Sequence, residues 1–189
     1  IVNQQVKYMM NKDLGYNGKQ IMMINFSESD PKPWLKYERL KTEMRKIKGV
    51  TDISYGEAVP GNGRSSSSNM DFKDKSIQGQ HGSMDYNYLK FINVKLKNGR
   101  WLDPNLSSDT INNVMVNEAF VRKFGWKDED ALKNEIRPGF DNKNYKIVGV
   151  VKDFNIRSLR TQVEPIIFFY YRETEWKRFN VYNIQLKIN

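Results

Sequence analysis

The chain has 189 residues, 39% of them hydrophobic and 13% aromatic, which is enough to bury the core of one large domain or two small ones. It has no cysteine, which excludes disulfides and thiolate metal sites, and its formal net charge of +9 leaves nucleic acid, anionic lipid and acidic proteins open as partners. The longest apolar stretches, 147–151 and 166–171, are far shorter than the roughly 20 residues that cross a bilayer.

The start of the chain predicts a short amphipathic helix. Val2, Val6 and Met9 recur at helical spacing over residues 1–14, and Gly15 is placed to end the helix in a left-handed turn. The first residue is not methionine, and polar residues interrupt the apolar positions. We therefore expect a piece of a longer protein with no signal peptide at its start.

A strand, a helix and a second strand are expected next. The nearly unbroken apolar run 21–26 predicts a buried strand, and 50–59 predicts another. Between them, Asp30 and Pro31 suit a helix start and Gly49 suits its end. The apolar residues of this helix recur three and four positions apart, at Trp34, Tyr37, Leu40, Met44 and Ile47.

This helix also carries the densest cluster of charge in the sequence. The basic residues are interleaved with acidic ones, which favours a solvated helix face over a dedicated phosphate-binding surface. The cluster comprises Lys36, Glu38, Arg39, Lys41, Glu43, Arg45, Lys46 and Lys48.

The composition changes at Pro60. Residues 61–82 are rich in glycine, serine and charge, which predicts an exposed loop with a weak hairpin and places His81, the only histidine, at the surface. In 86–96 the apolar residues are so dense that their pattern fits a helix and a strand equally well. The pair Asn98–Gly99 predicts a turn.

Further along, the sequence predicts strands and one capped helix. Residues 114–116 predict a strand, Asn117 can cap a helix that ends at Gly125, and 128–130 predicts a solvated polar loop. Residues 145–151 are apolar on both faces, which predicts a strand in the centre of its sheet.

Two more strands are expected at the end of the chain. An aromatic strand is predicted at 166–171, directly after Pro165. The last strand alternates, which predicts that Tyr182, Ile184, Leu186 and Ile188 point inward and that Asn183, Gln185 and Lys187 point outward.

No group of residues in the sequence predicts catalysis. A single histidine cannot supply a zinc site with two imidazoles, and the carboxylates at 128–130 adjoin a helix end instead of a cleft. Gly61, Gly63 and Arg64 resemble a phosphate-binding loop only loosely, because no Lys-Ser or Lys-Thr pair follows. We expect no catalytic, cofactor-binding or metal-binding residues, and no cofactor.

Four segments, taken in order, carry a specific signal. They are Lys12–Asn17 (KDLGYN), Asn98–Leu102 (NGRWL), Val116–Gly125 (VNEAFVRKFG) and Ile147–Phe154 (IVGVVKDF), with Ser158, Leu159 and Pro165 beyond. Over essentially its whole length the chain resembles the extracytoplasmic (periplasmic) core domain of MacB-type, FtsX-like ABC transporter permeases. Its start is similar to the second such domain in the duplicated permeases common in Bacteroidetes.

The resemblance implies an α+β fold in which a porter-like mixed sheet with packed helices is interrupted by a smaller inserted α+β subdomain. The composition break at Pro60 and the apolar return at Tyr145 then place the porter-like subdomain at residues 1–59 and 145–189, which share one sheet. Residues 1–14 would be its stalk helix, and 60–144 the inserted subdomain. The positions that the motifs single out are then architectural: Gly99, Arg100, Asn117, Glu118, Gly149 and Asp153.

The resemblance also implies a non-catalytic domain that couples cytoplasmic ATP hydrolysis to export or to mechanical work outside the membrane. Its partners would be the transmembrane helices of the same permease, a cytoplasmic ABC ATPase subunit, a second permease copy and a periplasmic adaptor, with no nucleic acid. It would lie on the periplasmic face of the bacterial inner membrane, anchored by flanking transmembrane helices. A periplasmic ligand- or peptide-binding module with a basic surface is the alternative, and a small hydrolase is a third.

Overall fold

The structure is a computed structural model that describes residues 13–25, 33–61, 65–140, 143–157, 162–170 and 183–189. The strands are β1 (Ile21–Asn25), β2 (Val50–Ser54), β3 (Ser66–Phe72), β4 (Lys75–Met84), β5 (Leu96–Gly99), β6 (Asn113–Asn117), β7 (Glu135–Pro138), β8 (Tyr145–Val151), β9 (Ile166–Tyr170) and β10 (Asn183–Ile188). The helices are α2 (Pro33–Met44), α3 (Tyr88–Phe91), α4 (Ser107–Ile111), α5 (Glu118–Phe124) and α6 (Asp128–Ala131). The predicted α+β class is confirmed. The stalk helix expected over residues 1–14 lies outside the described residues, which begin at Asp13.

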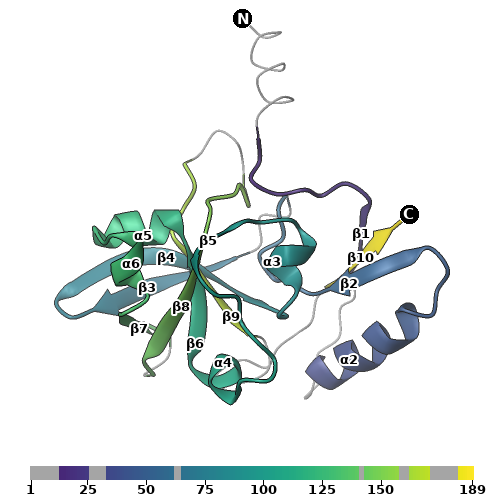
Figure 1. The fold of residues 1–189 in the computed structure, drawn as a ribbon, viewed down its shortest axis with the longest axis horizontal. Helices are drawn as coiled ribbons and strands as arrows, with labels where there is room; N and C mark the ends of the chain where they lie inside the picture. Colours follow the sequence, from purple (N-terminus) through teal and green to yellow (C-terminus); the bar gives the residue numbers. More distant parts are fainter. Residues whose placement is uncertain (1–12, 26–32, 62–64, 141–142, 158–161, 171–182) are drawn as a thin grey trace, which may run out of the picture.

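The strands form two sheets, with α2 beside the smaller one and α5 and α6 beside the larger one (Figure 1). The smaller sheet has three antiparallel strands in the order β1-β10-β2. The larger sheet is mixed and has seven strands in the order β5-β8-β6-β9-β4-β3-β7. Because β7 also pairs with β8, the strands from β8 round to β7 form a closed ring that leaves few free edges.

β8 is enclosed on every side. It pairs with β6 along one edge and with β5 and β7 along the other. Val148 and Val151 belong to one apolar cluster, and Ile147 and Val150 belong to the other, so both faces of the strand are buried. The prediction of a central strand at 145–151 is confirmed.

The expectation that residues 1–59 and 145–189 share one sheet is wrong. β8 and β9 lie in the seven-stranded sheet, and only β10 joins β1 and β2. The reason is that β8 and β9 are apolar on both faces, so each needs a central position that is covered on both sides. The larger sheet offers such positions, because its central strands contribute to two different apolar clusters. The strands β8 and β9 therefore pair with β4, β5, β6 and β7, all of which begin in the segment 60–144 that we expected to be a separate insertion.

The helices α2 and α3 both contact β2 of the three-stranded sheet. Ser54 and Gln185 are cross-strand partners on one face, and Ile53 and Leu186 are partners on the other. The predicted outward orientation of Asn183 and Gln185 into solvent is wrong, since they are only 3% and 1% exposed. The polar side of β10 packs instead against the segment after β2, where the Gln185 amide donates to a backbone carbonyl at 3.3 Å.

Residues 66–82 form more regular structure than their composition suggests. β3 and β4 form a long antiparallel hairpin, and the second half of β4 runs parallel to β9. His81 is 4% exposed, and its ring centroid lies 4.4 Å from that of Phe140 and 6.5 Å from that of Phe169. The predicted surface position of His81 is therefore wrong, because β4 continues past the hairpin into the larger sheet.

Three local expectations are refined by the structure. α2 has Tyr37 buried on its inner side, but it ends before Ile47, which is 54% exposed. Residues 86–96 contain the helix α3 and the start of β5, and 128–130 begins the short helix α6 instead of a loop. Gly99 ends β5 with a φ of 76°.

In the part of the chain that the structure describes, no helix is both long and apolar enough to cross a membrane.

Asp85 joins the two sheets. It follows β4 of the larger sheet, and it is only 2% exposed. Its carboxylate accepts hydrogen bonds from the Tyr37 hydroxyl, from Ser54 Oγ at 2.6 Å and from Lys41 Nζ at 3.0 Å, all on the side of the smaller sheet. The Asn87 backbone N–H also donates to it, at 3.0 Å. A buried carboxylate is stable only while such donors surround it, so Asp85 favours one relative position of the two sheets.

We expect Asp85→Ala to lower the free energy of unfolding by about 3 kcal/mol or more. The substitution leaves the buried donors of Tyr37 and Ser54, and the charge of Lys41, without their acceptor. Urea unfolding followed by circular dichroism measures the effect. The control is Glu129→Ala at an exposed position of α6, which should change stability by about 0.5 kcal/mol or less. Equal effects of the two variants would contradict the role given to Asp85.

Candidate functional site

Two of the motif segments meet where β6 passes into α5. The side chain of Asn117 caps the helix, because its Oδ1 accepts from the Phe120 N–H at 3.1 Å. The same oxygen accepts from the Ile166 N–H at 3.0 Å, and Nδ2 donates to the Glu164 carbonyl at 2.9 Å. Asn117 therefore fixes the start of α5 and the start of β9 together. The predicted cap at Asn117 and the predicted helix end at Gly125, with a φ of 77°, are both confirmed.

Glu118 and Asp153 tie α5 to the end of β8 in both directions. Asp153 Oδ1 accepts from the Ala119 N–H at 2.8 Å, and Oδ2 lies 2.5 Å from Nη2 of Arg122. In return, Glu118 Oε2 accepts from the Asp153 N–H at 2.9 Å. Both carboxylates lie at the N-terminus of a helix, where free backbone N–H groups and the helix dipole stabilise negative charge.

Lys97 of β5 extends this pair into a network. Its Nζ lies 2.7 Å from Glu118 Oε1 and 2.7 Å from Asp128 Oδ2. Burial alone would raise the pKa of Glu118, but the hydrogen bonds from Lys97 and from the Asp153 amide outweigh burial and hold this pKa below its usual value. The hydrogen bonds to Asp128 and Glu118 raise the pKa of Lys97. Ionised groups therefore hold β5, α5 and α6 to the end of β8.

The first described residues, 13–18, lie against this network, and we call them the entry segment. The Leu14 carbonyl accepts from the Asn155 N–H at 2.9 Å, and a second backbone hydrogen bond of 2.8 Å joins the segment to the residue after α3. Gly15 has a φ of 75°, and a Cβ at this position would lie 2.5 Å from the carbonyl oxygen of Asp153. Only glycine allows the segment to approach the end of β8 so closely.

The remaining motif positions, Gly99, Arg100 and Gly149, form a separate contact where β5 pairs with β8. Gly99 faces Gly149 in the β5–β8 ladder, and a Cβ on Gly149 would lie 2.3 Å from the Arg100 carbonyl oxygen. The Arg100 guanidinium binds the buried Asp109 carboxylate through hydrogen bonds of 2.5 and 2.8 Å, and Asn113 Nδ2 adds a third of 2.6 Å. Burial alone would raise the pKa of Asp109, but these donors lower it.

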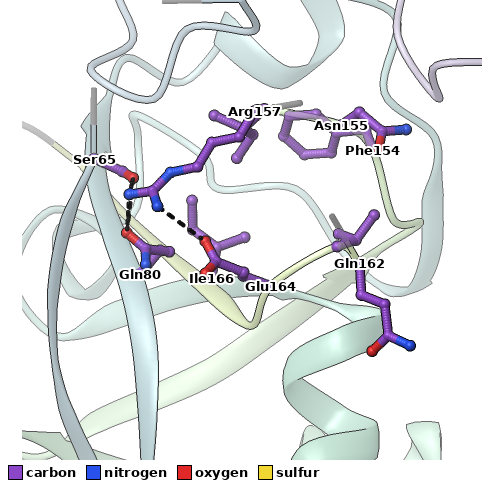
Figure 2. Close-up of a pocket in the computed structure, with 10 residues that line it drawn as sticks. Ser65, Gln80, Phe154, Asn155, Arg157, Gln162, Glu164 and Ile166 are labelled. Carbon is purple, nitrogen blue, oxygen red and sulfur yellow. Dashed lines mark hydrogen bonds and ion pairs between the residues drawn. The ribbon is translucent and has the colours of Figure 1, made fainter. Parts of the chain in front are cut away.

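A hollow beside the connection from β8 to β9 is closed by its own side chains. Figure 2 shows Arg157 reaching toward Ser65, Gln80 and Glu164. Nη2 lies 3.3 Å from Ser65 Oγ and 3.2 Å from Gln80 Oε1, and Nη1 lies 3.6 Å from Glu164 Oε2. The free volume is about 20 Å³, which is room for little more than one water molecule. These residues therefore join the connection to the β3–β4 hairpin and do not form a substrate pocket.

The polar groups of the site are engaged in contacts between structural elements. The side chains of Asn117, Glu118, Arg122 and Asp153 are engaged with backbone groups or with each other, in positions that hold elements together. Among the residues that the structure describes, no three histidine or acidic side chains gather as a metal site would require. The arrangement joins the entry segment, the end of β8 and α5 to one another.

Sequence reasoning missed two buried acids, Asp85 and Asp109. A charged residue between the apolar neighbours Met84 and Tyr86 was a usable signal for Asp85, since burial of a carboxylate demands donors around it. Asp109 gave no comparable signal, because the residues around it in the sequence are polar. Its partner Arg100 was singled out only as part of a motif.

The comparison with protein families matches residues 2–188 to the model of the MacB-like periplasmic core domain. The match includes all the described residues except Asn189, and so it takes in the entry segment, β8 and α5. The comparison with curated proteins gives no match.

Several solved structures share the fold. The periplasmic region of MacB from Actinobacillus actinomycetemcomitans has a TM-score of 0.64 and 14% identity, over 95% of this chain and 79% of that chain. The extracellular domain of the noncanonical ABC-type transporter YknZ from Gram-positive bacteria has a TM-score of 0.61 and 10% identity, over 89% and 82%. A domain of a proposed permease protein from Porphyromonas gingivalis has a TM-score of 0.56 and 18% identity, over 78% and 65%.

We expect Glu118→Gln to reduce the loss of stability that acid causes. The folded pKa of Glu118 lies below its unfolded value of about 4.3, so its ionised form stabilises the fold above that pH, and the contribution is lost as the pH falls through the folded pKa. Urea unfolding between about pH 7 and pH 3 should show the variant less stable at neutral pH, with the difference from wild type shrinking in acid. Glu129→Gln, on the exposed side of α6, should follow the wild-type curve. A difference that is constant across this pH range would contradict the prediction.

Proposed function

We propose a mechanical, non-catalytic function for this chain, which belongs to the MacB-like periplasmic core domain family. On this proposal the domain is part of an ABC transporter permease and couples cytoplasmic ATP hydrolysis to export or to other mechanical work outside the membrane. Movement enters through the entry segment and passes into β8 and α5.

The observation that carries the proposal is the docking of the entry segment on the end of β8. Gly15 packs against the backbone of Asp153 and Phe154, and the Leu14 carbonyl is hydrogen-bonded to Asn155. Asp153 in turn caps α5. A displacement of the entry segment therefore acts on a strand that is fixed on both edges and on a helix that is fixed at its N-terminus.

The distribution of charge supports a non-catalytic domain that does not bind nucleic acid. Lys41, Lys97, Arg100 and Arg122 each lie within 3.0 Å of an acidic oxygen of the chain itself. Basic side chains that are engaged in this way hold elements together and are not free to neutralise phosphates. Four of the basic side chains are thus engaged in ion pairs within the chain.

The family membership supports the proposed location and partners. We place the domain on the periplasmic face of a bacterial inner membrane, anchored by flanking transmembrane helices of the same permease. A cytoplasmic ABC ATPase subunit supplies the energy, and a second permease copy or a periplasmic adaptor is the expected extracytoplasmic contact.

Gly15→Ala should separate coupling from ATP hydrolysis. The added Cβ would meet the Asp153 carbonyl at 2.5 Å, so the entry segment must move away from β8. In the isolated chain we expect a loss of about 2 kcal/mol or more, from the positive φ and the overpacking together. In the full permease we expect ATP hydrolysis to persist and the transport-dependent phenotype to be lost.

The matched control is Gly49→Ala. Gly49 also has a positive φ, 95°, but a Cβ there would meet nothing within 4 Å. It therefore suffers the backbone strain without the displacement, and the permease should keep its transport phenotype. Normal transport in a stably expressed Gly15→Ala permease would refute the proposal.

A further inference from the structure

An open hollow of about 490 Å³ lies beside the first half of β8, whereas the entry segment contacts the chain just beyond the other end of this strand. The volume falls in the range of about 300–1,000 Å³ that is typical of ligand pockets. β8 also bulges here, because its ladder with β6 shifts by one residue and leaves Val148 without a partner in β6. Bulges are common next to functional sites. The polar side chains that line the hollow are those of Arg100, Ser108, Asn112, Asn113, Glu135 and Lys146.

Arg100 has one edge of its guanidinium left over for a ligand. Nη1 and Nη2 both bind the Asp109 carboxylate, and Nη1 also donates to the Trp101 carbonyl at 3.0 Å. A guanidinium has five N–H groups in a fixed planar fork. The two that remain, on Nε and Nη2, lie side by side and donate to no acceptor in the described part of the chain. The Arg100 side chain is 45% exposed, so a ligand can reach this edge.

Asp109 holds this guanidinium in place before any ligand binds. It is fully buried, and besides Arg100 it accepts from Asn113 Nδ2 at 2.6 Å and from the Asp103 N–H at 2.7 Å. Binding therefore does not have to order the arginine, which removes an entropic cost. Because Asp109 offsets the charge of Arg100, the free edge suits a planar acceptor with a single negative charge better than a phosphate.

Two free charges of opposite sign also line the hollow. Lys146 and Glu135 are cross-strand partners where β7 pairs with β8, and both are exposed. Neither side chain makes a hydrogen bond or an ion pair within the residues that the structure describes. Lys146 is therefore available to an anionic group, while Glu135 disfavours a ligand with more than one negative charge.

Apolar side chains border this polar lining. Leu132 lines the hollow, and Ile111 of α4 is 46% exposed. Ile111 follows the lining residue Ser108 by three positions, and residues three apart are neighbours on the surface of a helix. The hollow therefore suits a ligand that carries an apolar group next to its anionic group.

We propose that this hollow binds a carboxylate with an apolar group next to it, as in a free apolar amino acid or the C-terminal residue of a peptide. A carboxylate can accept two parallel hydrogen bonds from Nε and Nη2 of Arg100, and Lys146 adds a second positive charge. A cation would meet more repulsion than attraction, because Glu135 is the single acidic residue among the described residues of the lining. The inference does not depend on the mechanical function and is tested separately from it.

The test titrates the chain with N-acetylleucine and follows binding by nuclear magnetic resonance. We expect a Kd of about 1 mM or lower, and the Arg100 Nε–H signal should move downfield as the carboxylate binds. N-acetylleucinamide lacks the carboxylate and should bind about tenfold more weakly or worse.

Free leucine and the peptide acetyl-Ala-Ala-Leu distinguish the two sources of the carboxylate. Only free leucine has an ammonium group beside the carboxylate, and Glu135 can accept a hydrogen bond from it. Tighter binding of leucine would identify a free amino acid, and tighter binding of the peptide would identify a C-terminus. Both results support the proposed carboxylate site.

Variants of Lys146 and Glu135 locate the contact, because a substitution of Arg100 would leave the buried Asp109 without its partner. Lys146→Gln should weaken the binding of N-acetylleucine about threefold or more, and Glu135→Gln should strengthen it about twofold. The matched control is Lys152→Gln, at an exposed position just beyond β8 that does not line the hollow. It should change the Kd by about 1.5-fold or less.

Four results would overturn the proposal. One is no binding of N-acetylleucine, free leucine or the peptide at about 10 mM. Another is binding of N-acetylleucinamide as tight as that of the acid. The third is binding that leaves the Arg100 Nε–H signal unmoved or that Lys146→Gln and Lys152→Gln weaken equally, because the ligand then lies elsewhere. The fourth is inorganic phosphate that binds the hollow as tightly as N-acetylleucine, because the lining then acts only as a basic surface.

Discussion

The complete enclosure of β8 is the constraint on which the rest of the structure depends. One edge is paired with β6, the other is shared by β5 and β7, and the two faces contribute to different apolar clusters. Such a strand cannot shift without breaking hydrogen bonds on both edges. Gly149 makes the enclosure possible, because any side chain there would overlap the backbone of Arg100. Elements that attach to the end of β8 therefore attach to a fixed point.

α5 shows how this fixed point organises its surroundings. It runs only from Glu118 to Phe124, and a helix of this length is not stable alone. Its position comes from three sources: the Asn117 cap, the Asp153 carboxylate on its first turn, and the burial of Phe120 and Phe124. Two of the three are set by residues at the ends of β6 and β8. The entry segment touches the same Asp153, so it acts where the helix and the strand are joined.

The sequence predicts the elements well where their signals are local. The cap at Asn117, the helix end at Gly125 and the buried strand at 145–151 depend on neighbouring residues, and all are confirmed. Errors arise where distant segments decide the outcome. His81 is buried because β4 finds β9, and Gln185 is buried because the segment after β2 covers its face. The residues next to His81 and Gln185 in the sequence indicate neither the pairing of β4 with β9 nor the contact that covers Gln185.

The two sheets are connected to each other, and the entry segment lies close to both of them. The ring of the larger sheet is closed, and the three described strands of the smaller sheet are held to it by the buried carboxylate of Asp85. Tyr16 of the entry segment lines a hollow together with Ile21 and Met23 of β1, so the segment that contacts the end of β8 also borders the smaller sheet. On the proposed function, a displacement of the entry segment would therefore act on β1 of the smaller sheet as well as on the start of α5.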